Sequence, residues 1–159
     1  MASILPLPPG VVGEFVGRAH SDLGRISELL AGYPTVINAS FDWGNGDWET
    51  ALGAAAHSGR KDIVEFLLSR GARIDIFTAA FLGKLSLVRA FLHETPSALR
   101  STGPHGISLL EHARKGGNRE MIDYLDHLIH PEKAKAARAH AAAKSKLVSK
   151  AKPKRRRAA

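Results

Sequence analysis

The sequence contains no cysteine among its 159 residues. Disulfide bonds, thiolate nucleophiles and zinc sites that need sulfur ligands are therefore excluded, and the composition suits a reducing compartment. No stretch approaches the roughly 18 consecutive apolar residues of a membrane span. Residues 1–9 lack a basic start and are interrupted by prolines, which does not fit a secretory signal. We expect a cytoplasmic protein with no membrane segment.

The short motifs of common enzyme classes are also missing. There is no Gly-x-x-x-x-Gly-Lys-Ser/Thr phosphate loop, no Gly-x-Ser-x-Gly nucleophile elbow and no His-Glu-x-x-His zinc motif. Gly44 and Gly46 lie between two tryptophans without a preceding strand, which is typical of a turn. Because no nucleophile and base stand out as a pair, we predict no enzyme, no catalytic residue and no cofactor.

Charge is distributed unevenly along the chain. Residues 131–159 hold 11 Lys and Arg against one Glu, a net charge of +10, whereas residues 1–130 hold 12 basic and 14 acidic residues, a net charge of −2. Alanine and basic residues fill 21 of the last 29 positions. Such a segment buries too little apolar surface to offset the entropy lost on folding. We therefore predict a disordered basic tail over residues 131–159.

One short apolar pattern recurs four times along residues 1–130. An aliphatic residue is followed three positions later by a large apolar residue, which places both on one face of a helix. A small residue stands five positions before each aliphatic residue and marks a turn between two helices. The aliphatic residues are Ile26, Val64, Val88 and Ile122, and the small residues are Ser21, Gly59, Gly83 and Gly117.

Each unit is therefore a short helix, a turn and a second short helix, and stacked units would share one buried core. The pattern predicts an all-α fold with no substantial sheet. Leu67, Val88 and Phe91 are expected to be fully buried between units. The expected helices lie near residues 12–20, 22–31, 51–58, 61–70, 75–82, 85–93, 108–115 and 119–128.

The second unit resembles an ankyrin repeat. The family pattern is T-P-L-H-x-A-A-x-x-G, then I-V-x-x-L-L, then G-A; Ala51 stands here for its proline and Gly53 for its histidine. Residues 106–118 are similar to a second, more divergent copy. The residues that match the pattern in the second unit are Thr50, Leu52, Ala55, Ala56, Gly59, Ile63, Val64, Leu67, Leu68, Gly71 and Ala72.

The resemblance implies an ankyrin-type solenoid of about four helix pairs over residues 12–130, preceded by an extension at residues 1–11. Ankyrin units are normally joined by projecting hairpin fingers. Successive aliphatic residues of the repeat are 38, 24 and 34 positions apart, so the middle junction is too short for a finger. We expect fingers around residues 39–49 and 100–106, and none at residues 70–75.

The resemblance also implies that a partner binds at the exposed ends of the first helices, which line a concave face. Phe81 and Leu82 are there either a partner anchor or are covered by a neighbouring unit where the finger is missing, and both alternatives remain open. The residues at these helix ends are Ala19, His20, His57, Ser58, Phe81, Leu82 and Lys115.

The fingers supply the other candidate contacts. Trp43 and Trp48 flank the first finger, and we expect one to pack against the adjoining unit and the other to contact a partner. Asp47 and Glu49 beside them, together with Asp42, would suit a basic partner surface. His105 is the candidate on the second finger.

The last helix contains one candidate metal site. Asp123, His127 and His130 stand at i, i+4 and i+7, so they share one helix face and could in principle hold zinc or nickel. The competing interpretation is the polar outer face of a terminal repeat, which solubility requires. We favour the second and predict no metal ligand.

These observations predict a non-catalytic protein–protein interaction module, which we expect to be a monomer with an unidentified protein partner. The alternative is an adaptor whose tail binds DNA or RNA while the helical part recruits a protein. Residues 152–157 could equally act as a nuclear import signal in a eukaryote or only as a solubilising end. The candidate polyanion contacts are Lys150, Lys152, Lys154, Arg155, Arg156 and Arg157.

Overall fold

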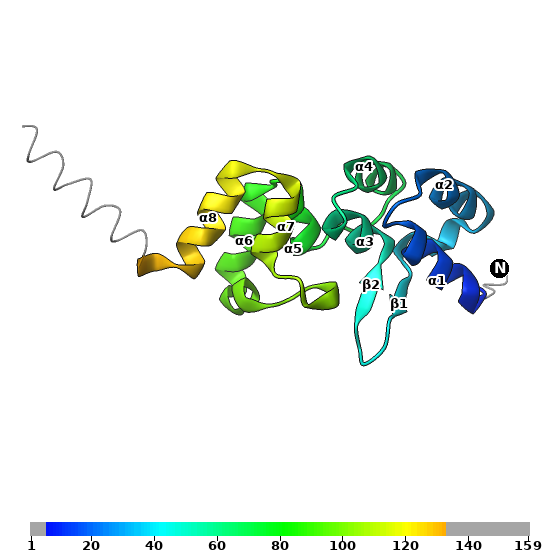
Figure 1. Ribbon diagram of the computed structural model, residues 1–159, viewed down its shortest axis with the longest axis horizontal. Coiled ribbons are helices and arrows are strands. Elements are labelled where there is room, and N and C mark those ends of the chain that lie inside the picture. The colour runs from blue at the N-terminus through cyan, green and yellow to red at the C-terminus, as the bar shows by residue number, and fades with distance from the viewer. Residues whose placement is uncertain (1–5, 133–159) are drawn as a thin grey trace, which may run out of the picture. The chain divides into compact units, whose positions relative to one another are not determined.

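The computed structural model describes residues 6–132, and this part of the chain is mostly helical (Figure 1). Every helix end lies within three residues of its expected position, so the four helix pairs inferred from the repeat are confirmed. Residues 133–159 of the predicted tail, with its polyanion contacts, lie outside the described residues. The helices are α1 Pro9–Arg18, α2 Leu23–Gly32, α3 Ala51–His57, α4 Lys61–Ser69, α5 Ile76–Phe81, α6 Leu85–Glu94, α7 Leu109–Gly116 and α8 Arg119–Ile129.

The chain divides into two units after Leu125, within α8, and the packing described here is that of the first unit. Along the described chain, no helix is long and apolar enough to cross a membrane.

Polar side chains fix where several of these helices begin. The carboxylates of Asp22 and Asp75 and the hydroxyls of Thr50 and Ser108 accept hydrogen bonds from backbone N–H groups of the first turn, at 2.6 to 3.3 Å. These N–H groups have no partner within the helix, so each cap stabilises its helix by about 1 kcal/mol. Helix α1 instead begins at Pro9, because a proline in the first turn needs no hydrogen-bond partner.

The expected glycine turns separate the two helices of the later pairs. Gly59, Gly83 and Gly117 have φ values of 76°, 68° and 70°, in the left-handed region that glycine adopts without strain. Each stands between the first and second helix of its pair, which confirms the interpretation of the repeated small residue.

The first helices of successive pairs pack against one another, with α1 against α3, α3 against α5, and both α3 and α5 against α7. Helices α2, α4 and α6 each pack on the first helix of their own pair. Small residues make the contacts between first helices possible, because their backbones can approach closely. The fully buried alanines of these helices are Ala51, Ala54, Ala55, Ala56, Ala79, Ala80 and Ala113.

Both expected fingers are present. The first finger, residues 39–50, is a hairpin of β1 Ser40–Asp42 and β2 Trp48–Thr50, paired antiparallel with Phe41 opposite Glu49; it projects beyond the helices (Figure 1). The second finger, residues 101–108, contains a short 3-10 turn at Pro104–Gly106, closed by a bridge between Thr102 and Ser108. No strand occurs at the described residues 70–75, as expected.

Two further 3-10 helices, Pro34–Asn38 and Pro96–Arg100, follow α2 and α6 and were not expected. Each begins with a proline, whose fixed φ suits the first turn.

The burial of Leu67 and Val88, both 0% exposed, agrees with the prediction, but the prediction for Phe91 is wrong. Helix α6 buries Val88 and Leu92, which are four residues apart, and this rotation leaves Phe91 44% exposed beside Leu87. In α2 and α4 the motif residues three apart are both buried, whereas α8, like α6, buries residues four apart, Met121 and Leu125. The sequence alone does not reveal this change of register.

Of the two alternatives for Phe81, the structure supports burial under a neighbouring unit, because Phe81 is only 4% exposed. The expectation of an exposed anchor at Phe81 is therefore corrected. Phe81 joins the buried core of the first two units, across the short junction. Helix α7 also packs on α5, where a Cβ atom placed on Gly116 would lie 1.7 Å from the Phe81 carbonyl oxygen. Leu82, the next residue, remains partly exposed.

Candidate functional site

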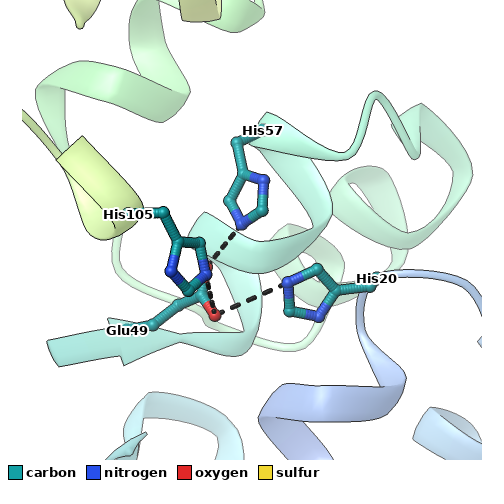
Figure 2. A group of neighbouring side chains, drawn as sticks. All are labelled: His20, Glu49, His57 and His105. Carbon is teal, nitrogen blue, oxygen red and sulfur yellow. Dashed lines mark hydrogen bonds and ion pairs between the residues drawn. The ribbon is translucent and has the colours of Figure 1, made fainter. Parts of the chain in front are cut away.

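A buried carboxylate lies at the base of the first finger. Successive side chains of a strand point to opposite faces, so β2 directs Trp48 outward, 61% exposed, and Glu49 inward, 1% exposed. Removing a charged carboxylate from water is costly unless polar or charged partners surround it. Figure 2 shows that three histidines supply most of this surrounding.

The three imidazole rings converge on the Glu49 carboxylate from three different segments. His57, at the end of α3, places its Nε2 2.6 Å from Oε1 of Glu49. His20, in the turn after α1, and His105, on the second finger, place their Nε2 atoms 3.6 and 3.5 Å from Oε2. Trp43 Nε1 also donates to Oε2, at 2.8 Å.

Two of the rings are held in place by hydrogen bonds at their Nδ1 atoms, on the side of the ring away from Glu49. His20 Nδ1 lies 3.0 Å from the Gly17 carbonyl oxygen, and His105 Nδ1 lies 2.8 Å from Asp47 Oδ2. A carbonyl and an ionised carboxylate only accept, so each Nδ1 carries the proton and donates it. The Nε2 atoms of His20 and His105 are therefore the ones left to face Glu49.

His105 is held in an unusual backbone conformation. Its φ is 57°, in the left-handed region that side chains rarely adopt, and such a conformation costs on the order of 1 kcal/mol or more. The backbone N–H of His105 donates to Asp47 Oδ1 at 2.9 Å, beside the bond from its ring to Oδ2. Asp47 of the first finger therefore holds His105 of the second finger with both carboxylate oxygens.

The hydrogen bonds keep both acids ionised. Burial tends to raise the pKa of Glu49, but hydrogen bonds from His57 and Trp43 outweigh it, so that the pKa lies below its usual value. The backbone N–H of His105 is the main cause that lowers the pKa of Asp47. The cluster thus combines two carboxylates with three imidazole rings.

The structure gathers most of the finger residues singled out from the sequence, but not as a partner surface. The side chains of Glu49 and His57 are 0% and 10% exposed, so the expectation that they contact a partner is corrected. Ala19 is also fully buried, against the expectation for the helix ends. Glu49 is instead the centre of the histidine cluster, which the sequence analysis did not assemble.

The two tryptophans take different roles. Trp43 donates to Glu49 and packs edge to face on Phe41, with ring centroids 4.9 Å apart, although 44% of the residue is exposed. Trp48 is the most exposed large apolar residue of the described part of the chain. It borders a cleft of about 580 Å³ between the two fingers, which Asp75 and Phe77 also line.

The remaining helix-end candidates lie outside this cluster. Lys115 is exposed and borders a second cleft of about 500 Å³ with Ile107 and Glu111. Ser58 and Leu82 are partly exposed. Ser58, Leu82 and Lys115 remain predicted contacts for a partner.

Two of the residues considered for a metal on the last helix form ion pairs with other side chains. Asp123 pairs with Arg119 at 3.0 Å, and His130 pairs with Glu132 at 3.3 Å. Within residues 6–132, the one group of three or more potential ligands that comes together is His20, Glu49, His57 and His105, whose ligand atoms all lie within 4.8 Å of one another.

Paired short helices joined by glycine turns and hairpin fingers define a helical repeat protein. Residues 47–79 match the family model for the ankyrin repeat, which confirms the resemblance drawn from the second unit. This segment runs from the tip of the first finger into α5. No curated protein and no solved structure matches the chain. Ankyrin repeats are generally protein–protein interaction modules, and the family is typically non-catalytic.

Proposed function

We propose that this protein is a non-catalytic ankyrin solenoid that binds a protein partner through its two fingers and the adjoining helix ends. The observation that carries the proposal is Trp48, which is 61% exposed at the rim of the cleft between the fingers. Large aromatic residues are enriched among the side chains that contribute most to protein–protein affinity. An exposed tryptophan on a rigid finger is such an anchor.

The fingers are already ordered in the absence of a partner. Paired strands form the first finger, and the two hydrogen bonds from His105 to Asp47 tie the second finger to it. A surface that is already ordered loses little conformational entropy on association. The geometry therefore supports recognition by a preformed scaffold.

The chemistry of the surface favours one kind of partner. The helical part carries a net charge of −2 over residues 1–130, and Asp42 is exposed on the first finger. We expect a partner segment that places an apolar side chain against Trp48 and basic residues around it. Ser58, Leu82 and Lys115 are proposed contacts at the helix ends.

Replacing the tryptophan tests this surface. A photoreactive phenylalanine analogue at position 48 should capture the partner from extracts of the native host, and Trp48→Ala should weaken binding of the captured protein at least tenfold. The matched control is Phe91→Ala, because Phe91 is also a large exposed aromatic residue but belongs to α6 and to neither finger. If Phe91→Ala reduced affinity and Trp48→Ala did not, the partner would bind elsewhere.

A second candidate function is nucleic-acid attachment through residues 131–159, which the charge of +10 favours. Each phosphate that a basic side chain neutralises releases counterions, so binding should weaken steeply as salt rises. Truncation after residue 130 should abolish the shift of labelled DNA or RNA in a gel and leave the helical circular dichroism spectrum of the core unchanged. Nucleic-acid affinity that survived truncation would place the site in the mildly acidic core and contradict this candidate.

A further inference from the structure

We propose that His20, His57, His105 and Glu49 bind a divalent transition-metal ion, with Zn²⁺ as the best-fitting species. Their four ligand atoms lie within 4.8 Å of one another, and Figure 2 shows the three rings directed at one carboxylate. The ligands come from α3, the turn after α1 and both fingers. His105 and Asp47 also line the cleft beside Trp48, so the metal site adjoins the proposed partner surface.

The spacing of the ligand atoms fits such an ion. With zinc–ligand distances of about 2.0 to 2.1 Å, neighbouring ligand atoms of a tetrahedral site lie about 3.3 Å apart. The Nε2 atoms of His20 and His105 are 3.6 and 3.5 Å from Glu49 Oε2, close to that spacing. His57 Nε2, 2.6 Å from Oε1, forms a hydrogen bond that the ion would replace.

Proton positions supply the strongest argument. Because Nδ1 of His20 and Nδ1 of His105 donate to acceptors behind the rings, each ring in its neutral form directs an Nε2 lone pair at a carboxylate oxygen. A lone pair and a carboxylate repel one another unless a proton or a metal ion lies between them. A bound cation removes this repulsion, and the lone pairs then become its ligands.

The outer contacts are those that metal-binding histidines commonly have. A ligating histidine usually donates its other ring N–H to a carboxylate or a backbone carbonyl, which orients the ring and makes it a better ligand. Asp47 provides the carboxylate for His105, and Gly17 provides the carbonyl for His20. A metal site would also explain the left-handed backbone of His105, because strained conformations cluster at binding sites.

The donor set decides the class of ion. Three imidazole nitrogens and one carboxylate oxygen suit zinc and its neighbours in the first transition row, whereas calcium and magnesium prefer oxygen ligands alone. The side chains of His20 and His105 are 30% and 35% exposed, so an ion can enter from solvent. Four protein ligands would close the coordination shell, which is typical of a structural site.

Binding should hold the fingers to the helices. His20 and His57 belong to the helical layer, Glu49 to the first finger and His105 to the second, so one ion would join all of these segments. A ligand that binds only the folded protein raises its unfolding temperature. The ion would therefore stabilise the full chain and tighten the finger region.

The test uses the full-length chain without a polyhistidine tag, stripped with EDTA and titrated with ZnCl₂ in a calorimeter. We expect one equivalent to bind and raise the unfolding temperature. His20→Gln and His105→Gln should each weaken zinc binding at least tenfold, and Glu49→Gln should do the same. His93→Gln is the matched control, because the His93 side chain is 84% exposed on α6 and outside the cluster.

Co²⁺ supplies a readout that reports geometry. Four-coordinate Co²⁺ gives intense visible absorption, which should appear with the wild-type chain and His93→Gln but not with His105→Gln. In a Trp48→Phe background the remaining tryptophan, Trp43, should lose fluorescence on Co²⁺ addition, since it donates to Glu49. If Glu49→Gln unfolds, as circular dichroism would show, the two partly exposed histidine variants carry the test. Equal zinc affinity in wild type, His20→Gln and His105→Gln would overturn the proposal.

Discussion

The junction between α2 and α3 and the junction between α4 and α5 occupy equivalent places in the repeat, yet they differ in content. The first contains the β-hairpin finger and carries Glu49 and both tryptophans. The second, residues 70–75, contains no described secondary structure, and Asn38 holds it by accepting from the Arg73 N–H at 2.8 Å and donating to the Gly71 carbonyl at 3.3 Å.

This difference shows what the length of a junction controls. A long junction can fold back as a finger and bring polar side chains from distant units to one point, as Asp47 and His105 demonstrate across 58 positions. A short junction leaves the first helices of two neighbouring units in contact without a finger, as α3 and α5 show, and Phe81 of α5 joins the buried core of the first two units there. The polar cluster around Glu49 therefore lies under the fingers, whereas the units joined without a finger meet through apolar packing.

The largest expected effect lies in the packed region. Leu67 is 0% exposed on α4, so Leu67→Ala should lower the free energy of unfolding by about 2 to 5 kcal/mol, from lost apolar burial and the cavity left behind. Urea denaturation followed by circular dichroism would measure it.

Phe91→Ala provides the contrast, because Phe91 is 44% exposed although the repeat places it in an equivalent motif. We expect this change to be clearly smaller than that of Leu67→Ala. A change as large as that of Leu67→Ala would mean that Phe91 is covered in solution, and the burial pattern of α6 would then be wrong.

The sequence predicted the positions of the helices and fingers better than the contacts between them. The aliphatic spacing located all four helix pairs, and the spacing of 24 located the missing finger, because both follow from the local periodicity of a helix. The departures within the helices were Phe91, where α6 is rotated, and Phe81, whose burial depends on a neighbouring unit. Neither is encoded in the periodicity of its own helix.

The cluster around Glu49 was harder to foresee. Each of its residues was noticed as a finger or helix-end residue, but as a possible contact for a partner. One signal was available in the sequence. Successive residues of a strand point to opposite faces, so Trp48 and Glu49 cannot both point outward. That His20, His57 and His105 meet there follows from the stacking of units, which no local pattern reports.

A second prediction tests the tight contact between α7 and α5. A Cβ on Gly116 would lie 1.7 Å from the Phe81 carbonyl oxygen, which is backbone and cannot rotate away. Gly116→Ala should therefore force α7 away from α5 and cost about 1 to 3 kcal/mol of stability. The midpoint of urea denaturation is the measurement.

Gly10→Ala is the control for that change, since a Cβ at Gly10 in α1 meets no atom within 4 Å. Alanine is the better helix former, so this variant should be neutral or slightly more stable. If Gly116→Ala also gained stability, α5 and α7 would have to be farther apart than described.

The smallest expected effect concerns a polar group beneath the second finger. His112 of α7 is 0% exposed; its Nδ1 lies 2.9 Å from the Ser108 carbonyl oxygen and donates to it. Its Nε2 has no hydrogen-bond partner among the described residues, and the Phe77 ring lies 5.2 Å from its own. Burial therefore lowers the pKa of His112 below its ordinary value of 6.5.

The sign of the pH dependence follows from this shift. The unfolded chain binds a proton at His112 more readily than the folded chain does, so stability is full above about pH 6.5 and falls as the pH drops below it. The loss should be about 1.4 kcal/mol for each pH unit until the lowered pKa is reached. Wild type and His112→Asn, compared in EDTA between pH 7.5 and 5 by urea denaturation, would isolate it, because the asparagine amide can still donate to Ser108 but does not titrate. His93→Gln, at an exposed histidine, should keep the wild-type slope. An unchanged slope in His112→Asn would show that water or a proton reaches Nε2 in the folded protein, and that the space under the second finger is open to solvent.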